Sequence, residues 1–287
     1  MQLDDERESD SIEDRRGGGM GLGGLGIGVT LIALVASYFL GINPSTLLGV
    51  AENVQHTAAS NAPSHPVDPR TDPEAAMVSE VRRVLALTED TWDAIFKQAG
   101  GQYRRPHLVL FRGTTPTACG TGQSAMGPFY CPGDQKVYLD LGFFNEMAKR
   151  FHAGGDFARA YVIAHEIGHH VQRLTGVTEK TDAMRSRMSK ADFNRISVRV
   201  ELQADCYAGA WAHHANRSRR FIQPGDVEEA LTAANAIGDD TLQRQSRGTV
   251  VPDSFTHGSS AQRMCWFKAG FETGSIKACD TFAAKSL

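Results

Sequence analysis

The stretch AYVIAHEIGHHVQ, residues 160–172, places two histidines four residues apart, with a glutamate directly after the first of them. In an α-helix, residues four apart lie on one face with about 6 Å of rise between them, so His165 and His169 can reach one ion together. The surrounding residues are apolar, and burying imidazoles and a carboxylate there is costly unless they are paired or bind a metal. The stretch therefore predicts a helix over residues 156–174 that provides two histidine ligands of a metal site.

Glu166 follows the first histidine, so its carboxylate is expected beside the ion rather than bound to it. This is the H-E-x-x-H arrangement, in which the glutamate takes a proton from a water molecule that the metal activates. Gly168 has no side chain, which lets other backbone or a substrate approach the helix near the ion. The motif is short enough to occur by chance, and the alternative is an amphipathic helix whose histidines are packed or solvated.

A catalytic zinc site normally has three protein ligands and one open position, so a further ligand must come from elsewhere in the chain. The positions where the longer metzincin motif has glycine and histidine hold Gln172 and Thr175, which excludes that extension. The stretch VRVELQADCYAGAWA places Glu201 and Asp205 on one face of a helix expected over residues 193–215. We expect Glu201 to be the third ligand and Asp205 to accept the other ring N–H of a ligand histidine. Without a metal, the alternative is a helix with an exposed acidic face.

Four sequence blocks in a fixed order carry a family resemblance: GPFYCPGDQKVYLDLGFF, HEIGHHVQ, ELQADCYAGAWA and FTHGSSAQR. Together they resemble the bacterial "putative neutral zinc metallopeptidase" family, often membrane-anchored, over roughly residues 74–282. The paired H-E-x-x-H and E-x-x-x-D helices are also similar to those of the gluzincin peptidases. The resemblance implies that His165, His169 and Glu201 bind Zn²⁺, that Glu166 is the general base, and that Asp205 orients a ligand histidine.

A peptidase of this kind also needs a hydrogen-bond donor for the negative charge that develops on the carbonyl oxygen. His257, in the block FTHGSSAQR, is the expected donor, although its alignment with the donor of thermolysin-like enzymes stays open. Tyr138 and Tyr207 are the alternatives. For each of the three, ordinary packing or surface hydrogen bonding is the competing interpretation.

The first part of the chain predicts a membrane anchor. No charged residue occurs over residues 17–51, and MGLGGLGIGVTLIALVASYFLGI provides 23 mainly apolar residues, enough to cross a hydrocarbon core of about 30 Å. Arg15 and Arg16 precede this run, and no base follows it until Arg70, so the positive-inside rule places the N-terminus in the cytoplasm. A cleavable signal peptide and a buried glycine-rich helix are the alternatives.

This gives four expected regions: an acidic cytoplasmic tail (1–19), a transmembrane anchor (20–43), a flexible linker (44–71) and a zinc metallopeptidase domain (72–287). The domain would then lie in the periplasm or outside the cell, attached to the inner membrane by a single span. Seven acids and three bases fall within the first sixteen residues, and the rest of the chain is close to neutral. A near-neutral body offers no clustered basic surface for nucleic acid.

The order of elements predicts an α+β domain with a small sheet and a bundle of helices, and the family resemblance implies that this domain is zincin-like. HLVLFRG reads as a strand, and MGPFY and KVYLDL read as two strands joined by a turn at CPGD. A helix is expected to follow Asp72 and Pro73, and another over residues 227–244, opened by a capping box of Asp226 and Glu229.

The five cysteines agree with export to an oxidising compartment. Cys119 and Cys131 lie twelve residues apart in a turn-rich region, and Cys265 and Cys279 lie fourteen apart in another, so each pair is expected to form a disulfide. Cys206 falls in a helical pattern and is expected to be a buried, inert thiol.

Together these features predict a membrane-anchored zinc-dependent peptidase, in particular an endopeptidase, that acts on peptide or protein substrates. A zinc-stabilised binding or scaffold protein that cleaves nothing is the alternative, and a zinc hydrolase of other amides is a third. The presence of Glu166 favours catalysis, because a binding protein needs the ligands but has no need of a general base.

Overall fold

The computed structural model describes residues 1–17, 67–68 and 70–287 and confirms the expected α+β class. The strands are β1 (Ile12–Asp14), β2 (His107–Leu110), β3 (Thr114–Thr117), β4 (Gly120–Gln123), β5 (Phe129–Cys131) and β6 (Lys136–Leu139). The helices are α3 (Ala75–Gln98), α4 (Gly142–Phe151), α5 (Asp156–Leu174), α6 (Val177–Arg185), α7 (Lys190–Arg219), α8 (Asp226–Ala236), α9 (Asp239–Arg247) and α10 (Ser260–Thr273). Short 3₁₀ helices lie at Ser124–Met126 (η1), Pro252–Ser254 (η2) and Ile276–Cys279 (η3).

Four strands form one sheet in the order β1-β2-β6-β5. β1 and β6 both run parallel to β2, and β5 is antiparallel to β6, with Tyr130 opposite Val137. The expected strands and the turn at CPGD are therefore confirmed. A separate hairpin, β3–β4, was not expected, because TTPT and GTGQ contain the proline and glycines that strands usually lack.

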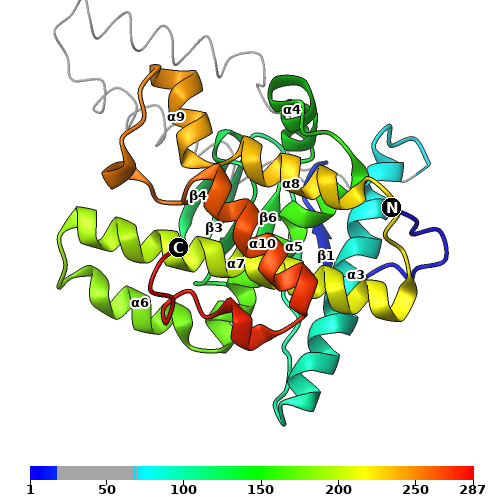
Figure 1. The fold of residues 1–287 in the computed structure, drawn as a ribbon. Helices are drawn as coiled ribbons and strands as arrows, with labels where there is room; N and C mark the ends of the chain where they lie inside the picture. The colour runs from blue at the N-terminus through cyan, green and yellow to red at the C-terminus, as the bar shows by residue number, and fades with distance from the viewer. Residues whose placement is uncertain (18–66, 69) are drawn as a thin grey trace, which may run out of the picture.

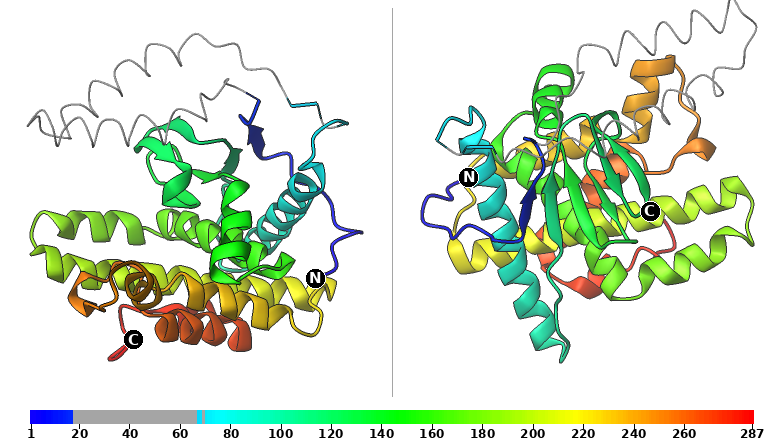
Figure 2. Two further views of the ribbon diagram at one scale, coloured as in Figure 1. Left: turned by 90° about the horizontal axis from the view of Figure 1, so that it is seen from above. Right: turned by 180° about the vertical axis from the view of Figure 1, so that it is seen from behind.

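The helices pack on one side of the sheet. In Figure 1 helices α7 and α10 lie in front of the strands, and the opposite view in Figure 2 shows the strands in front. α5 packs against α7, and α7 packs against α10. Glycines allow these helices to approach closely: a Cβ at Gly209 would lie 2.0 Å from the carbonyl oxygen of Phe267, and one at Gly168 would lie 3.0 Å from that of Ala204. The close approach expected at Gly168 is thus made by α7.

The first residues of the chain belong to the folded body, contrary to the separate acidic tail expected over residues 1–19. β1 pairs with β2, Leu3 is buried in the core, and the Met1 ammonium lies 2.8 Å from an Asp156 oxygen and 3.1 Å from an Asp226 oxygen. Figure 2 shows this segment beside α3 and the sheet. An acidic side chain of this segment also pairs within the domain, since Glu13 lies 2.8 Å from the Lys136 ammonium, and the domain therefore begins before residue 72.

Within the described residues, no helix is long and apolar enough to cross a membrane. The anchor expected over residues 20–43 and most of the linker expected over 44–71 lie outside the described part of the chain. The residues that flank this interval meet each other, because Arg16 forms ion pairs with Asp72 and Glu74.

The single helix expected over residues 227–244 is two helices, α8 and α9, separated at Ile237 and Gly238. A Cβ at Gly238 would lie 2.4 Å from the Ser260 hydroxyl, so the chain turns there against the start of α10. The expected capping box is also wrong. Asp226 accepts the backbone N–H of Gln223, and Glu229 accepts that of Phe157, so both carboxylates serve other segments.

Two disulfides join the chain. Cys119–Cys131 is confirmed, and the second bridge is Cys206–Cys279 rather than the expected Cys265–Cys279. Cys265 is an exposed free thiol on α10. Sequence spacing favoured the nearer cysteine, but packing of α7 against η3 puts the buried Cys206 next to Cys279, although 73 residues separate them.

Candidate metal centre

Two neighbouring helices bring together the three residues expected as metal ligands. His165 and His169 lie on α5, Glu201 lies on α7, and one potential ligand atom from each lies within 4.8 Å of the other two. The Nε2 atom of His165 is 3.2 Å from one Glu201 oxygen, and the Nε2 atom of His169 is 3.6 Å from the other. The predicted convergence of these two helices is therefore present in the structure.

Hydrogen bonds on the far side of each imidazole fix its orientation. The Nδ1 atom of His165 is 2.8 Å from an Asp205 oxygen, as expected for Asp205, and the Nδ1 atom of His169 is 2.9 Å from the Gln172 side-chain oxygen. Both acceptors hold the ring proton on Nδ1, so both Nε2 atoms are left to bind a metal. Two imidazole nitrogens and one carboxylate are a donor set that zinc accepts.

Asp205 is completely buried and is held by a network that the sequence did not suggest. It accepts hydrogen bonds from the Tyr161 hydroxyl at 2.6 Å and from two nitrogens of Arg263, each at 2.9 Å. Arg263 lies on α10 and is itself buried, so it supplies the positive charge that a buried carboxylate requires. α10 thus supports the metal centre from behind α7.

The electrostatics of the centre favour a cation. Burial opposes a charge on both histidines, but neighbouring carboxylates outweigh it: Asp205 and Glu201 raise the pKa of His165 to about 10, and Glu201 raises the pKa of His169. Burial likewise opposes the charge of Glu201, yet the two histidines hold its pKa well below the usual range. The two histidines therefore retain protons that a divalent ion would displace on binding, whereas Glu201 is already ionised.

The three groups line a cleft of about 1070 Å³. Glu166, the residue expected to act as the base, lines the same cleft and is largely buried. Aromatic side chains from β5 and α4, namely Phe129, Tyr130, Phe143 and Phe151, also line it. The cleft thus combines the polar centre with an apolar, largely aromatic surface.

His257 lines this cleft too, from the loop between η2 and α10. Its Nδ1 atom is 3.2 Å from Asp239, which also accepts the backbone N–H groups of Thr256, His257 and Gly258. Asp239 raises the pKa of His257 through this hydrogen bond, against the opposing effect of burial. The imidazolium form, which can donate a second hydrogen bond from Nε2, is thereby favoured.

The two tyrosines considered as alternative donors lie elsewhere. Tyr138 is buried and donates its hydroxyl proton to Asp134, 2.7 Å away, and Tyr207 packs edge-on against Trp92 in the core. Neither lines the cleft. Their positions exclude both as donors to a substrate in this cleft.

The third histidine of HEIGHH has a different role from the other two. The Nε2 atom of His170 donates to the Arg104 carbonyl at 2.6 Å, which leaves Nδ1 to accept from the Tyr130 hydroxyl at 3.0 Å. Burial lowers the pKa of His170 to about 4, so it stays neutral. This histidine fixes the hydroxyl of a cleft residue, and no short motif could have distinguished it from a ligand.

Comparison with known proteins agrees with the sequence resemblance and extends it. The family model described as "Putative neutral zinc metallopeptidase" matches residues 1–282, so the match includes the N-terminal segment outside the range expected from the four blocks. The chain is 47% identical to "Uncharacterized protein YpfJ" of Escherichia coli K12 over 294 residues, which cover 98% of this chain and 99% of the relative. It is 44% identical to "Uncharacterized protein Rv2575" of Mycobacterium tuberculosis over 71% of each chain. No solved structure matches it.

Proposed function

The chain belongs to the putative neutral zinc metallopeptidase family, and on this premise we propose that it hydrolyses peptide bonds in the cleft beside α5 and α7. One observation carries the proposal: His165, His169 and Glu201 converge from two helices with both Nε2 atoms directed at one carboxylate. We assign these three residues as zinc ligands. Zinc held there would supply a Lewis acid that polarises the scissile carbonyl and activates a water molecule.

Glu166 acts as the general base in this proposal. Its place in the cleft, one residue after a ligand histidine, lets it remove a proton from the attacking water and return that proton to the leaving amine. General acid–base catalysis of this kind typically contributes about 10²–10⁴-fold to the rate. Asp205 has no contact with substrate in this account and acts by orienting His165.

His257 donates the hydrogen bond that stabilises the developing oxyanion. Its bond to Asp239 occupies Nδ1, which leaves the Nε2 proton available to a substrate in the cleft that His257 lines. A donor of this type typically contributes about 10²–10³-fold to kcat. The raised pKa of His257 keeps the donating form present at higher pH than for a free histidine.

The substrate in this proposal is an extended peptide, and internal bonds are cut. β5 is the last strand of the sheet, it contacts α5, and its residues Phe129 and Tyr130 line the cleft. An extended chain could add to such a strand through main-chain hydrogen bonds. Because an edge strand can pair with the middle of an extended chain, we favour an endopeptidase.

We place the catalytic domain in an oxidising compartment, the periplasm or the exterior. Cys119–Cys131 and Cys206–Cys279 support this location, since disulfides persist where thiols are not kept reduced. Because residues 1–17 are part of the domain, we assign them to the same compartment as β2.

Glu166→Gln separates catalysis from metal binding. We expect this variant to retain about one zinc per chain but to lose hydrolysis of internally quenched peptides with blocked termini. Glu228→Gln, a change in the first turn of α8 outside the cleft, is the control and should behave as the parent. Equal turnover by the Glu166→Gln variant would remove the base assignment, and a zinc-loaded parent without any turnover would favour a binding or scaffold protein.

A further inference from the structure

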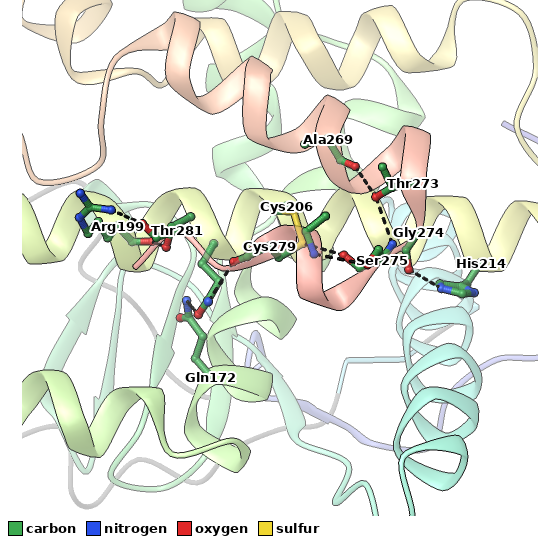
Figure 3. Close-up of a disulfide and its surroundings, with 12 residues drawn as sticks. Gln172, Arg199, Cys206, His214, Ala269, Thr273, Gly274, Ser275, Cys279 and Thr281 are labelled. Atoms are coloured by element: carbon green, nitrogen blue, oxygen red, sulfur yellow. Dashed lines mark hydrogen bonds between the residues drawn. A yellow bond between two sulfur atoms is a disulfide. The ribbon is translucent and has the colours of Figure 1, made fainter. Parts of the chain in front are cut away.

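A chain of hydrogen bonds runs from His169 to the C-terminal part of the protein. The Gln172 oxygen accepts from His169 Nδ1, and Gln172 Nε2 donates to the Gln203 oxygen at 3.1 Å and to the Val200 carbonyl at 2.7 Å. Gln203 Nε2 in turn donates to the Cys279 carbonyl at 3.0 Å. Gln172, Gln203 and Cys279 are all buried. Figure 3 shows Gln172 beneath Cys279.

Two backbone carbonyls set the direction of every bond in this chain, that of Cys279 at its end and that of Val200 beside Gln172. A backbone carbonyl only accepts hydrogen bonds, so Cys279 requires the NH₂ group of Gln203 and leaves the Gln203 oxygen to face Gln172. The Val200 carbonyl and the Gln203 oxygen together require the NH₂ group of Gln172, which leaves its oxygen to face His169. His169 must then carry its proton on Nδ1, and Nε2 is free for the metal.

The Cys279 end of this hydrogen-bond chain is itself fixed to α7. The Cys206–Cys279 disulfide attaches η3 one residue after Asp205, and Thr281 donates from its hydroxyl to the Arg199 carbonyl at 2.7 Å. Arg199 returns hydrogen bonds to the carbonyls of Thr281 and Ala284, the latter at 3.2 Å. We call residues 279–284, together with this disulfide, the C-terminal clamp; Figure 3 shows it lying along α7.

We propose that the C-terminal clamp is a positioning element for the metal ligand His169, acting through Gln203 and Gln172. This inference rests on the proposed function, because it assumes that His169 binds the metal. Without the clamp, the Gln203 amide loses the acceptor that decides its orientation. Gln172 then keeps its orientation through the Val200 carbonyl alone, and whenever its amide turns, the NH₂ group faces His169, favours the proton on Nε2 and blocks the metal-binding nitrogen.

The two histidines therefore have different kinds of support. His165 is oriented by a charged group, Asp205, whose oxygens are equivalent and cannot be turned the wrong way. His169 is oriented by a neutral amide with two unlike ends, and only the downstream carbonyls distinguish them. Loss of the C-terminal clamp is thus expected to change the orientation of His169 and not that of His165.

Three kinds of variant test the proposal in the full-length protein. Gln172→Met removes the acceptor of His169, and loss of such a partner typically weakens metal binding about 10- to 100-fold. Gln172→Glu keeps an acceptor and should bind zinc more tightly than Gln172→Met. Gln203→Met leaves the disulfide intact and should weaken zinc binding about 2- to 10-fold, the equivalent of one hydrogen bond of about 0.5–1.5 kcal/mol.

The paired change Cys206→Ser/Cys279→Ser should have an effect similar to Gln203→Met. Cys119→Ser/Cys131→Ser removes the other disulfide and is its matched control, with zinc affinity expected at the parent value. Zinc affinity and release are measured by competition with a chromophoric chelator, and ¹⁵N NMR of the histidines reports which nitrogen of His169 carries the proton. At a pH above the raised pKa of His169, where the ring is neutral, the Nδ1-protonated signal of the parent should give way to a mixture in the Gln203→Met protein.

The outcomes separate this inference from the proposed function. If the parent binds zinc and the Gln203→Met and Cys206→Ser/Cys279→Ser proteins match it in affinity, release rate and His169 tautomer, the clamp has no positioning role. If Cys119→Ser/Cys131→Ser weakens zinc binding equally, the effect is a general loss of rigidity and the inference is also wrong. A parent that binds no zinc would refute the proposed function and, with it, this inference.

Discussion

Arg263 offers a quantitative test of the network behind the metal centre. Both Arg263 and Asp205 are buried, and the two groups share two hydrogen bonds of 2.9 Å. The change Arg263→Met retains much of the side-chain volume but leaves Asp205 as a buried carboxylate without its cation. Breaking one partner of such a pair typically costs about 3–5 kcal/mol, which for a domain of this size lowers the melting temperature by roughly 6–20 °C.

The pKa of Asp205 gives an independent estimate of the same interaction. Burial raises this pKa, but Arg263 and then His165 outweigh burial and hold it at about 2, against an ordinary value of 3.8. Because a tenfold change in proton affinity is about 1.4 kcal/mol, the lowering corresponds to roughly 2–3 kcal/mol of folding stability. For a depressed pKa, this stability is fully present above pH 4 and is lost as the pH falls through about 2.

The variant should show the opposite dependence on pH. Without Arg263, burial is expected to raise the pKa of Asp205 above its unfolded value, so a proton relieves the unpaired charge. The destabilisation by Arg263→Met should therefore be largest near pH 8 and shrink as the pH falls towards 5. Urea unfolding of chelator-treated protein at several pH values measures this difference without a contribution from metal binding.

Arg244→Met is the matched control. The Arg244 side chain is 63% exposed and lies 3.8 Å from Asp240, so its loss should change the free energy of unfolding by less than about 0.5 kcal/mol. The reasoning fails if Arg263→Met lies within about 1 kcal/mol of the parent at pH 8. It also fails if the destabilisation is the same at every pH, because Asp205 would then not be the group left unpaired.

Two further predictions concern the cleft and the N-terminal segment. His257→Gln should lower kcat by about 10²–10³-fold and abolish the fall in rate at alkaline pH. The parent shows this fall because His257 loses its imidazolium proton as the pH rises through its raised pKa. An unchanged fall in the variant would exclude His257 as the donor. In a Cys265→Ser background, a cysteine is placed at Asp4 or at Asp253, two positions that are each 86% exposed. Asp4→Cys and Asp253→Cys should react with a membrane-impermeant thiol reagent from the same side of the membrane. Labelling from opposite sides would contradict the pairing of β1 with β2.

The candidate metal centre was predictable because it depends on helical periodicity. The expected helix over residues 156–174 coincides with α5, and a spacing of four fixes which face carries each side chain. Glu201 and Asp205 could be placed for the same reason, although their approach to α5 required a second helix to pack there. Gly168 permits that approach and can be identified from the sequence. The sequence alone does not show which helix packs against it.

The features that sequence reasoning missed depend on contacts between distant segments. β1 is only three residues long, IED, and owes its conformation to β2, almost a hundred residues later. Cys206 pairs with Cys279 because helix packing, rather than sequence spacing, brings them together. Gln172 lies within the quoted motif, yet its role depends on Gln203 and the Cys279 carbonyl, which no local pattern connects to it.

The central claim is that α5 and α7 hold one divalent ion between them. The most direct measurement is a crystal structure of the zinc-soaked Glu166→Gln protein with anomalous diffraction at the zinc edge. We predict one anomalous peak about 2.0–2.2 Å from Nε2 of His165, Nε2 of His169 and a carboxylate oxygen of Glu201. A peak elsewhere, or a Glu201 carboxylate beyond bonding distance of the ion, would contradict the account.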